Sequence, residues 1–164
     1  MYKKIAFAFG VAAAVSATPA LAAGQQATGT VDVLLQVSNS CSVKAQPLNF
    51  GTLTDFSQAL SGSSATKVNC TPGAPYTVFV DYGQNAGAGS QRKLKMTDAS
   101  NNSYFIDYKV FTASGGAVEW TPSVGVSGTG NGSDQDMTLW GSVPSQASKP
   151  AGSYSDQLVV TLNY

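Results

Sequence analysis

Histidine is absent from this sequence of 164 residues, and only 11% of the residues are Asp, Glu, Lys or Arg. The lack of imidazole excludes histidine-dependent acid–base catalysis, histidine metal sites and a histidine pH switch. Nine basic and nine acidic residues cancel to a formal net charge of zero, so we expect no binding to nucleic acid or to anionic membranes. Because no serine or other nucleophile has a recognisable base, we also expect no enzyme activity and no cofactor.

Long hydrophobic runs are lacking as well, apart from the stretch Ile5–Val15, which is too short to cross a bilayer. Lys3 and Lys4 precede it, and the small-residue pattern Ala20-Leu21-Ala22 follows it. This order is typical of a signal peptide. We therefore predict a signal peptide over residues 1–22 and a mature chain of 164 − 22 = 142 residues without a transmembrane segment. An uncleaved N-terminal anchor is the alternative.

Helical periodicity is missing from the mature chain, whereas apolar residues alternate with polar ones in several short segments. The clearest are Tyr76–Tyr82, Tyr104–Phe111 and Met137–Val143, and weaker patterns cover Leu48–Gly51, Thr66–Cys70 and Leu94–Met96. Glycine, proline and asparagine separate these segments, as expected for turns between strands. About eight short strands in one domain predict an all-β sandwich.

Cysteine is scarce: Cys41 and Cys70 are the two in the sequence. In an exported protein an even count predicts a disulfide, and this pair has no competing partner. Closing a loop of about 30 residues would stabilise the fold by roughly 3 to 4 kcal/mol. Without histidine or further cysteines, the two thiols cannot complete a tetrahedral metal site.

Three other patterns have both a functional and an ordinary interpretation. Asp134-Gln135-Asp136 resembles a calcium loop but lacks the full ligand spacing, so a solvated turn is the better interpretation. Arg92-Lys93 followed by Lys95 forms a small basic cluster, which we interpret as an exposed strand rather than a partner site. Trp120 and Trp140 could stack on a sugar, but aromatic residues are also ordinary sandwich core.

The two ends of the mature chain carry further alternating patterns. Gly29–Val37 places Val31, Val33, Leu35 and Val37 on one face, and it could be an ordinary first strand or a strand for another molecule. Gly152–Tyr164 reads as a strand that runs to the last residue, with one face formed by Leu158, Val160, Leu162 and Tyr164. A terminal strand of this kind leaves an exposed edge unless another strand is added there.

Short motifs follow one another in a specific order along the whole mature chain. They are Cys41, Leu48-Asn49-Phe50-Gly51, Val68-Asn69-Cys70-Thr71-Pro72-Gly73, Tyr76–Tyr82, Arg92-Lys93-Leu94, Tyr108, Trp120 and Ala151-Gly152-Ser153-Tyr154-Ser155-Asp156. This order resembles the spore coat protein U-like secreted pilins, the subunits of archaic chaperone–usher pili. The resemblance implies an incomplete immunoglobulin-like β-sandwich that lacks its final strand and is completed by donor-strand exchange.

The same resemblance implies the domain organisation, the partners and the site residues. Residues 23–38 would be a donor-strand extension and residues 39–164 the pilin domain. The donor residues would be Val31, Val33, Leu35 and Val37, and the C-terminal strand gripped by the chaperone and bordering the acceptor groove would carry Leu158, Val160, Leu162 and Tyr164.

The implied partners are a periplasmic chaperone, an outer-membrane usher, further copies of the chain and other pilus subunits. The implied location is a pilus on the cell surface, reached through the periplasm, with a role in adhesion or biofilm formation. The alternative is a self-complete secreted β-sandwich that binds carbohydrate or coats a cell or spore surface.

Overall fold

A computed structural model describes residues 24, 26–87 and 89–164 and divides the chain into two parts after Gln36. In the first part the described residues are exposed and have no regular secondary structure. The signal peptide predicted over residues 1–22 lies outside the described residues. The part from Val37 to Tyr164 contains the folded domain.

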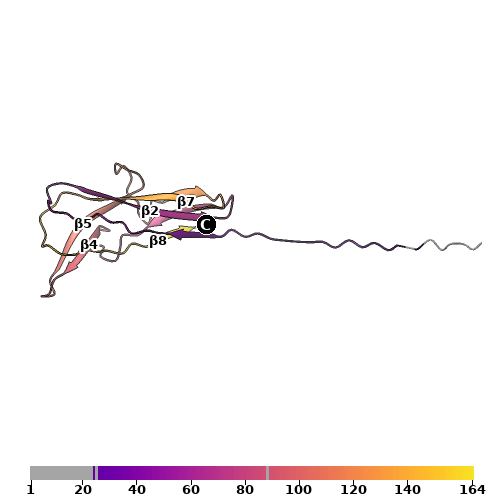
Figure 1. The fold of residues 1–164 in the computed structure, drawn as a ribbon, viewed down its shortest axis with the longest axis horizontal. Coiled ribbons are helices and arrows are strands. Elements are labelled where there is room, and N and C mark those ends of the chain that lie inside the picture. Colours follow the sequence, from indigo (N-terminus) through magenta and orange to yellow (C-terminus); the bar gives the residue numbers. More distant parts are fainter. Residues whose placement is uncertain (1–23, 25, 88) are drawn as a thin grey trace, which may run out of the picture. The chain divides into compact units, whose positions relative to one another are not determined.

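This domain is a sandwich of two antiparallel sheets, and its described residues contain eight strands (Figure 1). The strands are β1 (Cys41–Lys44), β2 (Leu60–Cys70), β3 (Pro75–Val80), β4 (Arg92–Thr97), β5 (Ser103–Phe111), β6 (Val126–Thr129), β7 (Gln135–Val143) and β8 (Val160–Asn163). One sheet has the order β1-β2-β7-β5-β4 and the other has the order β6-β3-β8. The predicted all-β fold is therefore confirmed. In the described part of the chain, no helix is long and apolar enough to cross a membrane.

The core lies between the two sheets and is built from the alternating residues that the sequence indicates. On β3 the inward face consists of Tyr76, Val78 and Val80, all buried. On β5 it consists of Ile106, Tyr108 and Val110. Trp120, from the connection between β5 and β6, is fully buried with them.

Trp120 also links the two sheets through its hydrogen bonds. Its indole Nε1 donates to the backbone oxygen of Val78 on β3 at 2.9 Å, and its backbone N donates to the oxygen of Val110 on β5 at 2.8 Å. A side chain held in this way cannot stack on a sugar. Trp140, by contrast, is 36% exposed.

The strand predicted over Leu48–Gly51 is wrong. Pro47 precedes this segment and Gly51 has a φ of 76°, so the chain turns there instead of extending. Leu48 and Phe50 nevertheless pack against the core, over Gly141 of β7. A Cβ atom on Gly141 would lie 2.7 Å from Phe50 Cζ and 2.8 Å from Leu48 Cδ2, so this close packing requires glycine.

The C-terminal strand is shorter than predicted, because the segment changes partner along its length. Ser155 forms an isolated bridge with Lys95 of β4, whereas Val160–Asn163 pairs with β3. The two partners belong to different sheets. The segment therefore crosses from the five-stranded sheet to the three-stranded one before its ladder, β8, begins.

Arg92 is the second correction, because we expected it on an exposed strand and it is 1% exposed. Its guanidinium donates hydrogen bonds to three backbone oxygens, those of Val80, Asp81 and Trp120. It also lies 3.3 Å from the carboxylate of Glu119. Burial lowers the pKa of the Arg92 guanidinium, and Tyr108 and Glu119 act in the opposite direction. Arg92 thus ties β4, in one sheet, to the end of β3 in the other.

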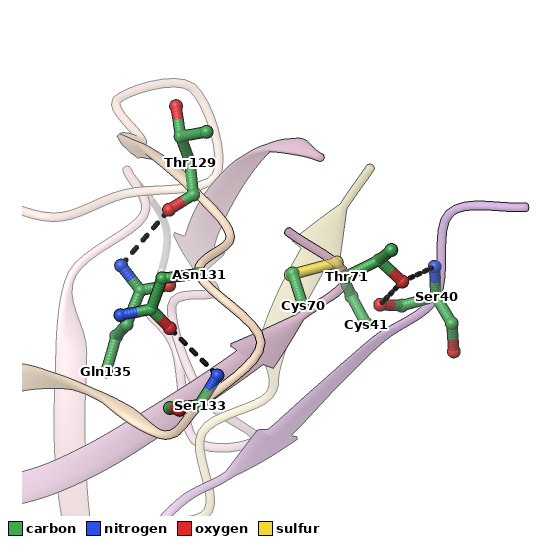
Figure 2. Close-up of a disulfide and its surroundings, with 8 residues drawn as sticks. All are labelled: Ser40, Cys41, Cys70, Thr71, Thr129, Asn131, Ser133 and Gln135. Carbon is green, nitrogen blue, oxygen red and sulfur yellow. Dashed lines mark hydrogen bonds between the residues drawn. A yellow bond between two sulfur atoms is a disulfide. The ribbon is translucent and has the colours of Figure 1, made fainter. Parts of the chain in front are cut away.

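The predicted disulfide between Cys41 and Cys70 is confirmed. It joins two residues that are direct neighbours in the β1–β2 ladder, and Figure 2 shows it beside Ser40 and Thr71. β1 has four residues and lies at the edge of its sheet. The disulfide therefore fastens a short edge strand that has few ladder hydrogen bonds of its own.

Replacing Arg92 tests its role as the tie between the sheets. Arg92→Ala should lower the free energy of unfolding by about 3 to 5 kcal/mol, because it leaves buried carbonyl oxygens without donors. Lys93→Ala, at the next position, should cost less than about 1 kcal/mol. Urea unfolding of the mature protein, followed by tryptophan fluorescence, measures both, and equal losses would contradict the assignment.

Removing the disulfide tests how far it stabilises β1. The double variant Cys41→Ser with Cys70→Ser should lose roughly 3 to 4 kcal/mol, the value expected for a loop of this length. The same urea titration in oxidising buffer measures the loss. A variant as stable as the parent would mean that the ladder alone holds β1.

Candidate functional site

The site is a groove between the loop that follows β1 and the segment that leads into β8. A cavity of about 400 Å³ opens there. Its lining is largely apolar: Pro47, Leu48 and Phe50 come from the loop, Leu158 and Val160 from the C-terminal segment, and Leu94, Tyr108 and Leu139 from β4, β5 and β7. The cavity therefore reaches the interior of the sandwich and exposes part of the apolar core.

Two edge strands meet beside this groove. β1 ends the five-stranded sheet and β8 ends the three-stranded sheet, so each pairs on one side in the described part of the chain. Cα atoms of the two strands approach within 8 Å of each other. An unpaired edge is a template for another strand, and here two such edges face one space.

The outward backbone groups of β8 can be identified from its neighbour Val159. The oxygen of Val159 accepts from Asp81 N at 3.1 Å, and its N donates to Asp81 Oδ1 at 2.9 Å, so both groups point toward the β3 side. Successive residues of a strand alternate in direction, which turns the backbone groups of Val160 and Leu162 toward the open edge. The side chains of these two residues pack against the core.

The structure brings together three of the four C-terminal residues named from the sequence. Leu158, Val160 and Leu162 are half-buried and pack against the core as one row. Tyr164 lies beyond the end of β8 and is 61% exposed. The row of half-buried apolar side chains therefore runs from Leu158 to Leu162 and ends before Tyr164.

The four N-terminal residues named from the sequence are exposed. Val31, Val33 and Leu35 are 86 to 89% exposed in the first part of the chain, and Val37 is 74% exposed at the start of the second. Leu34, on the opposite face of the alternation, is 92% exposed. The described residues of the segment have no secondary structure, and both faces of its alternating pattern are exposed.

Asp156 fixes the wall of the groove on the C-terminal side, a role that sequence reasoning missed. Its carboxylate accepts hydrogen bonds from Tyr108 Oη at 2.8 Å and from the backbone N of Asn85 at 3.1 Å. Burial, and next the hydrogen bond from its hydroxyl to Asp156, raise the pKa of Tyr108. Gly83, with a φ of 81°, leaves room for the carboxylate, which a Cβ atom there would overlap. In the sequence, Asp156 was marked only as the last residue of the motif Ala151–Asp156, with no indication of its partners.

Thr66 contributes an unpaired polar atom to the groove. Its Oγ1 is buried and has no hydrogen-bond partner in the described part of the chain, and the residue lines the cavity. A buried hydroxyl without a partner costs about 1 to 3 kcal/mol. The groove therefore combines an apolar lining with one buried hydroxyl that has no partner in the described part of the chain.

The acidic pattern Asp134-Gln135-Asp136 does not form a metal site. Asp134 accepts from Asn69 at 3.0 Å and pairs with Lys44 at 3.3 Å, and Asp136 pairs with Lys67 at 2.9 Å. The hydrogen bonds from Asn69 and Lys44 lower the pKa of Asp134. Among residues 24, 26–87 and 89–164, no group of three or more acidic or cysteine side chains could hold a metal ion.

Replacing Asp156 tests the anchoring of the groove wall. Asp156→Ala should lower the free energy of unfolding by about 2 to 4 kcal/mol, because it leaves the Tyr108 hydroxyl and the Asn85 amide without their acceptor. Asp136→Ala removes an exposed ion pair and should cost less than about 1 kcal/mol. Urea unfolding of the mature protein distinguishes the two, and a mild effect at Asp156 would mean that the wall is held otherwise.

Comparison with known proteins gives one family and two similar folds. The family model described as Spore Coat Protein U domain matches residues 27–161. A crystal structure of the CsuC–CsuE chaperone–tip adhesion subunit pre-assembly complex, from the archaic chaperone–usher Csu pili of Acinetobacter baumannii, is similar with a TM-score of 0.54 and 24% identity. The match covers 78% of this chain and 40% of that chain, so it spans less than half of the relative and supports the fold.

A chaperone–tip adhesin complex of CFA/I fimbriae is similar at a lower level, with a TM-score of 0.47 and 11% identity, over 74% of this chain and 40% of that one. No curated protein matches the sequence.

Proposed function

The chain belongs to the spore coat protein U domain family, and from this premise we propose that it is a structural subunit of a chaperone–usher surface pilus, polymerised by strand donation. In this proposal the N-terminal segment of one copy enters the groove beside β8 of the next copy. The contact is head-to-tail, so it propagates into a fibre instead of closing as a dimer.

Members of this family are structural proteins and not enzymes, and the same holds for this chain. The absence of histidine agrees with that assignment. Its proposed function therefore depends on binding other protein chains and on forming a fibre with them.

The observation that carries the proposal is the pairing of an open strand edge with an exposed alternating segment. β8 offers outward backbone groups at Val160 and Leu162, next to a cavity into the core. The segment offers backbone groups of its own and a row of aliphatic side chains, the combination that strand addition uses. Burying the side chains of Val31, Val33, Leu35 and Val37 would contribute about 6 to 12 kcal/mol before the cost of ordering the segment.

Insertion must also widen the space between β1 and β8. Their Cα atoms approach within 8 Å, whereas a strand between two others needs them about 10 Å apart, which is two interstrand spacings. The subunit would therefore have to open before it accepts a strand. A protein that holds the groove open before assembly would serve this step.

The proposed partners follow from that requirement. We expect a periplasmic chaperone to occupy the groove, an outer-membrane usher to catalyse exchange, and other subunits to join the fibre. The similar Csu structure is a complex of a chaperone with a subunit before assembly, which supports this order of events. A fibre on the cell surface would serve adhesion or biofilm formation.

The alternative of a self-complete carbohydrate-binding sandwich has less support. Of the two tryptophans that could have stacked on a sugar, Trp120 is buried and hydrogen-bonded in the core. Residues 29–37 also belong to none of the eight strands, which favours pairing of this segment with another molecule over pairing within its own domain.

A charge on the apolar face of the segment tests strand donation. Val33→Asp should abolish fibres, because it would bury a carboxylate in an apolar groove, while secretion and the disulfide stay intact. Leu34→Asp, one residue away on the opposite face, is the matched control and should leave fibres at the parent level. Negative-stain microscopy and an SDS-resistant ladder from protein co-expressed with its chaperone measure both.

Two outcomes would overturn the proposal. Fibres of normal length from Val33→Asp would show that this face is not buried in the fibre. Equal loss from both variants would show that the segment tolerates no added charge on either face, which fits a general assembly defect and not a buried face.

A further inference from the structure

A second cavity, the β4 pocket, lies where β4 meets the C-terminal segment. It has a volume of about 550 Å³ and is lined by residues from β4, from the loop after β3 and from the segment that leads into β8. Two of these walls are joined by the bridge between Lys95 and Ser155, whose backbones exchange hydrogen bonds of 2.8 and 3.0 Å. Most residues of the lining are polar, in contrast to the groove beside β8.

Lys95 brings to the β4 pocket a positive charge that no carboxylate balances in the described part of the chain, and it is half-buried. The ion pairs of the described domain involve other basic residues, namely Lys44, Lys67, Arg92, Lys93 and Lys109. Asp156 also lines the pocket, but its carboxylate already accepts hydrogen bonds from Tyr108 and Asn85. The ammonium of Lys95 is therefore the charge that an anionic ligand would meet.

Two glutamines of the β4 pocket hold each other in a fixed arrangement. Gln84 Nε2 donates to Gln157 Oε1 at 2.6 Å. This bond leaves the Oε1 of Gln84 and the Nε2 of Gln157 without a partner in the described part of the chain, so an acceptor and a donor lie side by side. Neighbouring hydroxyl groups of a sugar, each of which both donates and accepts, match such a pair. Met96, half-buried in the same lining, supplies an apolar patch for the C–H face of a sugar ring.

The same residues disfavour other anionic ligands. A polyanion rich in phosphate requires several basic residues, and the pocket has one lysine. A peptide that binds by strand addition requires free backbone groups on an edge strand, and those of Lys95 that face the C-terminal segment are already paired with Ser155. A single charge among amides and hydroxyls suits a ligand with one carboxylate on each hydroxyl-rich ring.

We propose that the β4 pocket binds an acidic sugar of the uronic acid class, with Lys95 pairing with the sugar carboxylate and the amides of Gln84 and Gln157 binding its hydroxyl groups. Neither tryptophan lines this pocket, so the proposed site does not depend on aromatic stacking. The natural ligand would be an acidic polysaccharide, which repeats the same charged ring along its length.

The β4 pocket can operate in a fibre that forms by strand donation. β1 and β4 end the five-stranded sheet on opposite sides, and the donated strand would enter next to β1. Lys95 and Gln84 line the β4 pocket and not the groove, although Asp156 and Gln157 border both. Repetition of a weak site along the fibre would raise its overall affinity for a polymer. Binding of a short sugar by one subunit does not rest on the proposed function.

Three soluble probes test the class of ligand. Calorimetric titration of the mature protein with an oligogalacturonide should give saturable binding, expressed per subunit. The fully methyl-esterified form of the same oligosaccharide, which lacks the charge, should bind about tenfold more weakly because it loses the charge-assisted hydrogen bond to Lys95. An oligoglutamate of the same charge has carboxylates but no sugar hydroxyls, and it should also bind about tenfold more weakly, since it leaves the amides unpaired.

Three variants test the residues. Lys95→Gln and Gln84→Ala should each weaken binding of the oligogalacturonide about tenfold, because each removes one partner of the sugar. Lys149→Gln is the matched control, since Lys149 also forms no ion pair in the described domain but lies outside the β4 pocket, and it should bind as the parent does. Urea unfolding should give the same midpoint for Lys95→Gln as for the parent, which separates loss of binding from loss of fold.

Four outcomes would overturn the proposed site. They are no saturable binding of the oligogalacturonide, equal binding of its methyl ester, equal binding of the oligoglutamate, and equal weakening by Lys149→Gln, which would indicate attraction to charge in general. Each of them leaves strand donation standing. The variant Val33→Asp should bind the oligogalacturonide with the parent affinity per subunit, and if it also forms normal fibres, strand donation is overturned while the site is supported.

Discussion

In the part of the chain that the structure describes, β8 forms its ladder with β3 on one side and has no partner on the other, and the proposed function depends on this open edge. A strand whose outward backbone groups face a cavity cannot be completed by side chains, because the hydrogen bonds of a ladder require another backbone. The neighbouring edge of β1 adds a second row of such groups across less than 8 Å. In the proposed function a strand from another copy completes these edges, and the apolar lining of the groove would determine which face of that strand points inward.

The walls of the groove beside β8 are held without a strand between them in the described part of the chain. Here polar anchors hold them. Arg92 ties β4 to the end of β3 through backbone oxygens, and Asp156 holds the segment before β8 through Tyr108 and Asn85. Both side chains have their partners supplied by the chain itself, so the groove does not depend on an occupant for its polar contacts. Thr66 is the exception, since its buried hydroxyl lacks a partner at the place where a strand would enter.

Several elements could be predicted from the sequence because the pattern that encodes them is local. β3, β5 and β7 alternate strictly between inward and outward residues, and the disulfide follows from the presence of two cysteines. The segment Leu48–Gly51 misled the prediction, because its apolar residues reach the core from a turn and not from a strand. Apolar character predicted the burial of Leu48 and Phe50 correctly but could not determine the backbone conformation.

The residues that the sequence could not assign are those whose partners lie far along the chain. Arg92 appeared as one of three basic residues in a row of four, the usual composition of an exposed strand. Its burial depends on oxygens from Asp81 and Trp120, which only the packing of two sheets brings together. Asp156 is separated from Asn85 by 71 positions for the same reason. Buried polar anchors of this kind are set by tertiary structure, whereas strand periodicity is set by neighbours in sequence.

If strands are exchanged as proposed, the scarcity of charge in the chain determines which forces recognise the donated strand. The N-terminal segment presents aliphatic side chains and backbone groups, with Asp32 as its one charged residue after Gly24. Attraction between charges on exposed surfaces is screened by salt, whereas backbone pairing and burial of aliphatic groups are not. Recognition that uses the latter depends little on ionic conditions outside the cell. It also discriminates weakly between grooves of similar shape, so the alternation of the segment has to fix the register, and Asp32 is the residue able to distinguish one receiving edge from another by charge.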